Sequence, residues 1–83
     1  MEIMKVMNNC HIITVDRKDT IVSYTSPILE ISKGEVTKVY NKWDYSKTTL
    51  KHLNAALRKL GLDEIANMPR NKKEEYFQSE GLI

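Results

Sequence analysis

The sequence predicts a small α+β domain, in which an antiparallel sheet of two hairpins, with three or four strands from residues 10–41, is followed by helices. Two observations predict it. In the first half, β-branched and aromatic residues gather in short runs that turn residues separate; in the second half, apolar residues recur at helical spacing. The length of 83 residues, without repeats or a long linker, fits one domain spanning residues 1–83.

Two β-branched runs predict the first hairpin. His11–Val15 and Thr20–Thr25 flank the polar turn Asp16–Asp19. Ser26-Pro27 is then expected to interrupt the sheet, because proline has no N–H group to donate to a central strand ladder. Residues 3–7 have the composition of either a further short strand or a frayed end, and the sequence leaves both alternatives open.

A second hairpin is predicted from the next two apolar runs. Ile28–Ser32 and Glu35–Tyr40 are joined by Lys33-Gly34, and Gly34 can adopt the positive φ angle that a tight turn or its bulge requires. Apolar and polar residues alternate imperfectly on both strands, so the pattern does not determine the register.

An apolar stripe predicts one main helix over residues 47–60, with its leucines packed on the sheet. Ser46 stands where an N-cap oxygen is expected, and Gly61 can provide a left-handed C-terminal cap. The leucines of the stripe are three, four and three residues apart: Leu50, Leu53, Leu57 and Leu60.

The end of the chain predicts a short helix over residues 71–79. A turn over residues 63–68 should end before Pro69. Tyr76 and Phe77 would form the buried side of the last helix, and its solvent-facing side would carry Lys72, Lys73, Glu74 and Glu75.

Composition excludes several classes of protein. Hydrophobic residues make up 41% of the chain and charged residues 29%, which is typical of a globular rather than a disordered protein. The single cysteine, Cys10, excludes an internal disulfide and fits a reducing cytosol. No apolar run approaches the roughly 20 residues of a membrane span, and the stretch before Cys10 is too short for a signal peptide. We therefore expect a cytoplasmic protein without a membrane partner.

Charge is distributed unevenly along the chain. The net charge is only +2, but residues 42–60 carry five cations against Asp44 alone. This basic segment is either a solvated helix face or a surface that steers an anionic partner. Its cations are Lys42, Lys47, Lys51, Arg58 and Lys59.

The candidate binding surface is the segment 43–53, which joins aromatic residues, a helix start and a basic helix face. At 100° per residue, Lys47, Lys51, Asn54 and Arg58 form a stripe beside the leucines, whereas His52 lies roughly opposite them and is expected to be exposed. The predicted contact residues are Trp43, Tyr45, Ser46, Lys47, Thr48, Lys51, His52 and Arg58.

Catalytic and metal sites are weakly supported. Ser46, His52 and Asp44 have the residue types of a hydrolase, but Ser46 and His52 are six residues apart at a helix start and point in different directions. Cys10 and His11 would alternate across a strand and could not easily share one metal ion with His52. We expect no enzyme activity, no metal and no cofactor.

Anion binding at the helix start is a third interpretation. The N-terminal N–H groups and the helix dipole favour negative charge there, and Lys47 and Lys51 add to that field. Tyr40, Trp43 and Tyr45 are either a stacking surface for a nucleic-acid base or nucleotide, or a lid over a small core.

A resemblance to other proteins extends over roughly residues 20–75. It is carried by the segment Thr20–Pro27 and by the later helix start Tyr45-Ser46-Lys47-Thr48-Thr49-Leu50-Lys51-His52. The chain resembles a group of small uncharacterised proteins encoded by phages and mobile elements of Gram-positive bacteria. They share a serine-tyrosine strand, a hairpin and a tyrosine-serine-x-threonine-threonine-x-x-histidine helix start, and the lysine-rich segment Met68–Glu75 is similar to the ends of some members.

That resemblance implies an accessory protein in the cytoplasm of a bacterial host cell. We therefore expect a non-enzymatic protein that binds a host protein, for example to inhibit a defence nuclease such as a CRISPR effector. Direct binding of nucleic acid or a nucleotide is the alternative function, and a homodimer is compatible with so small a core.

Overall fold

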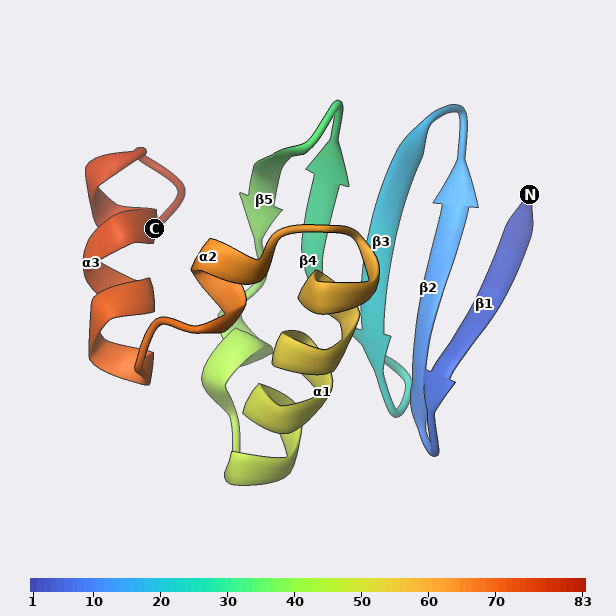
Figure 1. Cartoon of the computed structure of the whole chain (residues 1–83), viewed down its shortest axis with the longest axis horizontal. Coiled ribbons are helices and arrows are strands. Elements are labelled where there is room, and N and C mark those ends of the chain that lie inside the picture. Colours follow the sequence, from blue (N-terminus) through green and yellow to red (C-terminus); the bar gives the residue numbers. More distant parts are fainter.

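In the computed structural model, which describes residues 1–83, every strand pairs with its neighbour in the chain (Figure 1). The sheet has five antiparallel strands in sequence order, which makes it an up-and-down meander, and the α+β class is confirmed. The strands are β1 (Glu2–Met7), β2 (Cys10–Val15), β3 (Lys18–Ser23), β4 (Ser26–Ser32) and β5 (Glu35–Val39).

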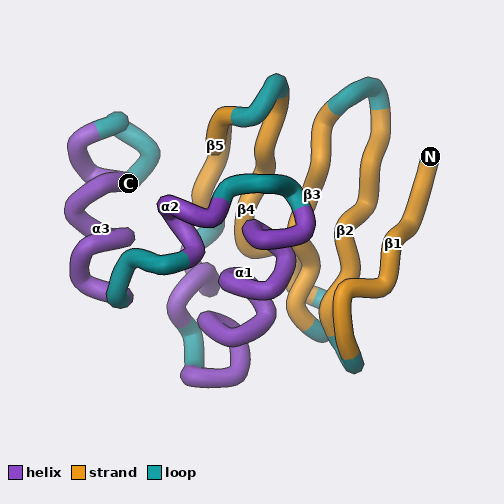
Figure 2. Tube along the Cα trace, viewed as in Figure 1, coloured by secondary structure: helices purple, strands orange, loops and turns teal.

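Four helical segments follow the sheet. They are the 3-10 turn η1 (Asn41–Asp44), the main helix α1 (Lys47–Lys59), the short α2 (Asp63–Ala66) and α3 (Arg70–Ser79). Helix α1 lies across one face of the sheet, and α3 stands beyond the β5 end (Figure 2). Alternate residues of β2 face these helices, so that Cys10 and Ile12 are buried while His11 and Ile13 are only half-buried.

The sheet extends beyond residues 10–41 at its N-terminal side. Residues 2–7 form the edge strand β1, which pairs with β2 and places Ile3 opposite Ile13. Of the two alternatives for this segment, the further strand is therefore correct. Because its exposed side lacks a neighbour, β1 has only one ladder of backbone hydrogen bonds.

The expected interruption at Ser26-Pro27 is wrong. Both residues belong to β4, where Pro27 lies opposite Val22 and the register shifts between Ile21 and Val22. A bulge leaves one residue of a ladder unpaired, and this is where a central strand tolerates a residue without an N–H group.

Tight turns join all five strands. All four connections span two residues, and the second hairpin turns at Lys33-Gly34 as predicted, with φ angles of 54° and 76°. Left-handed backbone occurs at the other three turns on non-glycine residues: Asn9, Asp16, Arg17 and Tyr24.

Helix α1 confirms the predicted boundaries to within one residue. The Ser46 hydroxyl oxygen accepts the Thr49 N–H at 3.1 Å, and Gly61 takes φ +79° just beyond the helix end. The buried face is rotated about the helix axis relative to the leucine stripe, so that Leu50 and Leu60 are only half-buried. Its fully buried residues are Thr49, His52, Leu53, Ala56 and Leu57.

Lys73 is buried, which contradicts its predicted place on the solvent-facing side of the last helix. Its ammonium group donates to the Ala66 carbonyl at 3.2 Å and to the Met68 carbonyl, at the end of α2. Burial lowers the pKa of Lys73, and the nearby Arg58 lowers it further. Lys73 thus ties α3 to α2 by satisfying carbonyl groups that a short helix leaves free.

The core lies between the helix-facing side of the sheet and the helices. Strand residues supply one wall, and α1, η1, α2 and α3 supply the other. The buried apolar residues are Cys10, Ile12, Ile21, Ile28, Leu29, Ile31, Trp43, Leu53, Ala56, Leu57, Ile65, Ala66 and Phe77.

Candidate functional site

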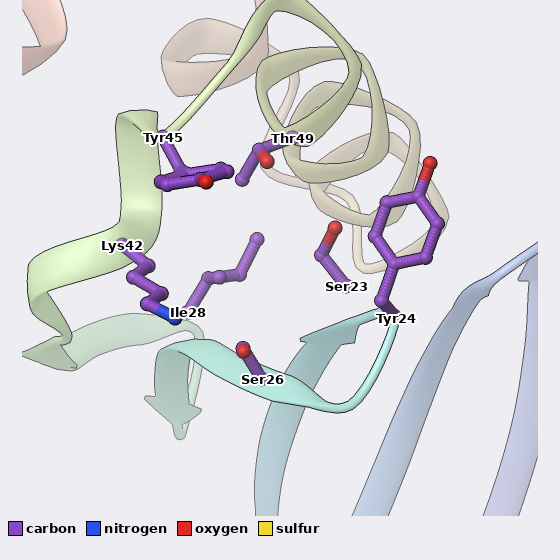
Figure 3. A pocket seen from close by; sticks show the side chains of 7 residues that line it. All are labelled: Ser23, Tyr24, Ser26, Ile28, Lys42, Tyr45 and Thr49. Carbon is purple, nitrogen blue, oxygen red and sulfur yellow. The ribbon is translucent and has the colours of Figure 1, made fainter.

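A pocket of about 170 Å³ opens between the β3–β4 turn and the start of α1 (Figure 3). The turn contributes one wall, and η1 with the first turn of α1 contributes the other. Seven residues line it: Ser23, Tyr24, Ser26, Ile28, Lys42, Tyr45 and Thr49.

Two exposed tyrosine rings flank this pocket on opposite sides (Figure 3). Tyr24 is 56% exposed and Tyr45 is 75% exposed, so both rings can be contacted from solvent. Tyr24 is held at φ +57° in the turn, and its N–H donates to the Asn9 carbonyl at 2.7 Å. Sequence reasoning did not identify Tyr24 as a site residue, and its place just before Ser26-Pro27 at a strand end was the available signal.

Cations at the pocket are not neutralised by the protein itself. The Lys42 ammonium lies 5.5 Å from the Tyr45 ring centroid, and no acidic residue lines the pocket. Asp44 is the acid of this segment, but the Arg70 guanidinium Nε donates to its carboxylate at 3.0 Å. Lys42, Lys47 and Lys51 form no salt bridge, so their charge is available to a partner.

Ser23 and His52 form a buried pair at the inner end of the pocket. The Ser23 Oγ and the His52 Nδ1 are 2.7 Å apart, and both residues are almost fully buried. The Cys10 thiol donates to the His52 carbonyl at 3.5 Å, and the Tyr24 ring lies 5.5 Å from the imidazole. Two strand residues and one turn residue thereby fix the position of α1 on the sheet.

Burial disfavours the charged form of the His52 imidazole. Burial lowers the pKa of His52, the charge of Lys51 lowers it further, and a contact with the backbone of Asn8 partly opposes both. If the second ring nitrogen donates to the Asn8 carbonyl, Nδ1 is the acceptor, and the Ser23 hydroxyl donates to it.

The three residues with hydrolase side-chain types, Ser46, His52 and Asp44, are not brought together. Ser46 caps α1, Asp44 is bound by Arg70, and His52 is bonded to Ser23 instead. Ser23 and His52 have the residue types of a nucleophile and its base, but the group behind the imidazole is the backbone of Asn8 rather than a carboxylate. No group of three or more His, Cys, Asp or Glu side chains is placed to hold a metal ion.

Two of the predicted contact residues are buried. Trp43 turns inward and packs edge-on against Phe77, with ring centroids 5.0 Å apart, so it belongs to the core. The predicted exposure of His52 is wrong because the buried face of α1 extends from Leu53 and Leu57 as far as His52, where Ser23 and the Tyr24 ring contact the imidazole. The remaining predicted residues are exposed: Tyr45, Ser46, Lys47, Thr48, Lys51 and Arg58.

Arg58 lies apart from the pocket. Its guanidinium donates to the Asn67 side chain at 3.1 Å, near the opposite end of α1 from Tyr45 and Ser46. The structure thus gathers Tyr45, Ser46 and Lys47 with Tyr24 at one end of the helix and leaves Arg58 at the other.

The lowered pKa of His52 predicts that the protein loses stability in mild acid. The unfolded chain binds a proton at an ordinary histidine pKa of about 6.5, whereas the folded chain resists protonation because its His52 pKa is lowered. This contribution to stability is present above that pH and is lost as the pH falls below it. Urea unfolding at about pH 8 and about pH 5.5 measures the loss, in a window above most carboxylate titrations.

Two substitutions test whether His52 causes that pH dependence of stability. His52→Asn lowers stability at both pH values by removing the buried pair, and it should remove most of the difference between them. His11→Asn, on the other face of β2, should keep the difference. A His52→Asn variant that retains the full acid sensitivity would contradict the assignment.

Comparisons with known proteins give a family but no function. A family of unknown function, DUF8033, matches residues 1–78, and the chain belongs to this family. Comparisons with curated proteins and with solved structures found no match. None of the helices has both the length and the apolar character needed to cross a membrane.

Proposed function

We propose that the protein is a non-catalytic module that binds a partner protein through the surface around Tyr24, Lys42 and Tyr45. Since its family has no assigned function, the proposal rests on the site itself. The observation that carries it is the pair of exposed tyrosine rings on either side of a pocket with an apolar residue, Ile28, in its lining. Tyrosine is enriched at protein interfaces and among the residues that dominate binding energy.

The size of the pocket supports a side-chain anchor. Sites for small molecules and cofactors usually enclose roughly 300–1,000 Å³. The pocket here has about 170 Å³, which suits a single inserted side chain better than a whole ligand. A partner side chain would pack between Tyr24 and Tyr45 and reach the hydroxyl groups of Ser26 and Thr49.

Charge supports an acidic contact surface on the partner. Lys42 lines the pocket without a salt bridge, and Lys47 and Lys51 on the exposed side of α1 have none either. Helix α1 contains four cations and no acidic residue. Opposite charge on the partner would accelerate association and disfavour basic competitors. In the phage or mobile-element setting that the resemblance implies, the partner is a host protein, and occupying the surface of a defence nuclease such as a CRISPR effector would inhibit it.

Capture followed by affinity measurement tests the proposal. The tagged protein is incubated with nuclease-treated bacterial lysate, each retained protein is purified, and its Kd is measured with the wild type and with Tyr45→Ala and Lys42→Glu. Both side chains are exposed, so these variants should fold normally. Loss of one anchor should weaken binding by about 10- to 100-fold.

Lys72→Glu provides the matched control. It reverses another exposed lysine, on α3 outside the pocket lining, and should leave the Kd unchanged. A partner whose Kd is the same for wild type, Tyr45→Ala and Lys42→Glu would show that another surface makes the contact.

Nucleic-acid binding is the second candidate, because the cations of α1 are unopposed on the helix itself. If retention depends on nucleic acid, it disappears after nuclease treatment, and the affinity for oligonucleotides falls steeply with salt. In that case Lys51→Ala should reduce the salt dependence, whereas a nuclease-resistant protein partner favours the first candidate.

A further inference from the structure

The two edges of the sheet are protected to different degrees. At one edge, β5 has five residues, carries Glu35 and Lys38 and contacts β4 through an irregular register. Charges and bulges of this kind prevent an edge strand from pairing with another chain. At the other edge, β1 presents Ile3 and Met4 at 61% and 48% exposure.

Exposed apolar side chains concentrate near the β1 edge. Seven large hydrophobic residues are exposed. Two are the pocket tyrosines, one is the last residue of the chain, and four lie in or next to β1 and β2. An open strand edge with exposed apolar residues is a template for strand pairing. The four residues are Met1, Ile3, Met4 and Val15.

We propose that two copies of this chain pair antiparallel through their β1 edges and form a dimer with one continuous ten-stranded sheet. The inference is independent of the pocket. The pairing satisfies backbone groups along the open side of the first residues of β1, which in the monomer can be satisfied only by water.

The side-chain pattern of β1 selects the register. A two-fold axis perpendicular to the sheet keeps the helix-bearing faces of both copies on the same side, so residues opposite each other must share a face. Placing Ile3 opposite Ile3 of the second copy satisfies this condition. Since Ile3 already lies opposite Ile13 within each chain, the pairing creates a row of four isoleucines across the face that bears no helix.

The charges of β1 are compatible with a second copy as the occupant. The strand carries one acid, Glu2, and one base, Lys5, so two strands meet without net repulsion. In this register Glu2 lies opposite Met4, and Lys5 approaches the end of the second strand that carries Glu2. The two Lys5 side chains are at opposite ends of the seam, so they are not placed opposite each other.

Sedimentation over a concentration series tests for the dimer. The wild type should shift from monomer to dimer with increasing concentration, because a seam of one strand buries less surface than a typical stable interface. Ile3→Lys places a charge at the centre of the seam and should abolish the dimer. Val15→Lys changes an exposed apolar residue of β2 on the same open face, but off the edge, and should leave the dimer intact.

A cysteine scan tests the register. Under mild oxidation Ile3→Cys should form an intermolecular disulfide, because opposite residues on antiparallel strands lie within reach of one. Glu2→Cys should not, because the two copies of residue 2 are offset by two positions along the seam. The natural Cys10 is fully buried, and burial raises the pKa of its thiol to about 11, so it does not compete.

Circular dichroism verifies that each variant is folded. The β1 seam is supported if the wild type dimerises with increasing concentration, Ile3→Lys does not, and Ile3→Cys forms the intermolecular disulfide. A wild type that stays monomeric throughout the series overturns it. A dimer that survives Ile3→Lys but is lost in Val15→Lys also overturns it, in favour of contact through the open face.

Discussion

Replacing Leu53 by aspartate should leave no cooperatively folded protein. Leu53 is fully buried at the centre of the α1 face that packs on the sheet. Removing a buried leucine side chain costs about 2–5 kcal/mol, and burying a carboxylate without a partner adds a further penalty. Domains are stable by only about 5–15 kcal/mol, and an 83-residue chain is at the small end of the size range.

Thermal and urea unfolding followed by circular dichroism measure the effect of Leu53→Asp. The expected result is the absence of an unfolding transition. Lys51→Asp, two residues away on the exposed side of the same helix, introduces the same side chain and should retain the transition. A soluble Leu53→Asp protein with a cooperative transition would mean that this leucine faces a partner surface rather than the core.

Replacing Trp43 by alanine should lower the free energy of unfolding by about 3–5 kcal/mol. The indole is 4% exposed and packs edge-on against Phe77, with an interplanar angle of 86°. The Arg70 guanidinium lies 5.6 Å from the indole ring centroid, so the tryptophan links η1 to two residues of α3. Alanine leaves a cavity at the junction of these elements, and both aromatic contacts are lost.

Urea unfolding followed by far-ultraviolet circular dichroism measures this loss without the tryptophan signal. Hydrogen exchange should show the largest increase in α3, which Trp43 holds through Phe77 and Arg70. Tyr45→Ala removes an exposed ring from the same segment and should change stability only slightly. A Trp43→Ala cost below about 1 kcal/mol would be inconsistent with a core tryptophan.

The Trp43 result also separates stability from binding. The aromatic residues of segment 43–45 look equivalent in the sequence, but the structure assigns Trp43 to the core and Tyr45 to the surface. Tyr45→Ala should therefore weaken partner binding more than it lowers stability. Trp43→Ala should lower stability more than it weakens binding.

Residue periodicity predicted most elements of this fold. The leucine spacing and Ser46 located α1 to within one residue, and Lys33-Gly34 located the second hairpin. These signals are local, because capping and tight-turn preferences depend on the nearest few residues. The strand β1 was less certain, since its first residues remain exposed and carry no alternating pattern.

Tertiary contacts decide what periodicity left open or predicted wrongly. Pro27 fits within β4 because the register shifts beside it, and Lys73 is buried because two carbonyl groups accept its hydrogen bonds. Neither arrangement can be predicted from residue periodicity. Hydrophobicity alone therefore places Lys73 in solvent and ends the strand at proline.

The candidate site was predicted only on its helical side. Tyr45 and the lysines follow from the helix start, whereas Tyr24 reaches the same pocket from a turn about twenty residues earlier. His52 was misplaced for a related reason. A helical wheel shows which residues share a face with the leucines, but the width of the buried face depends on the strands that it covers.

The meander order of the sheet also determines how the chain finds its fold. Each strand pairs with its neighbour across a two-residue connection, so little loop-closure entropy is lost when each ladder forms. Topologies with such local contacts fold faster than sheets of comparable size with crossing connections. We expect the hairpins to form first and the docking of α1, which joins residues distant in sequence such as Ser23 and His52, to complete the barrier crossing.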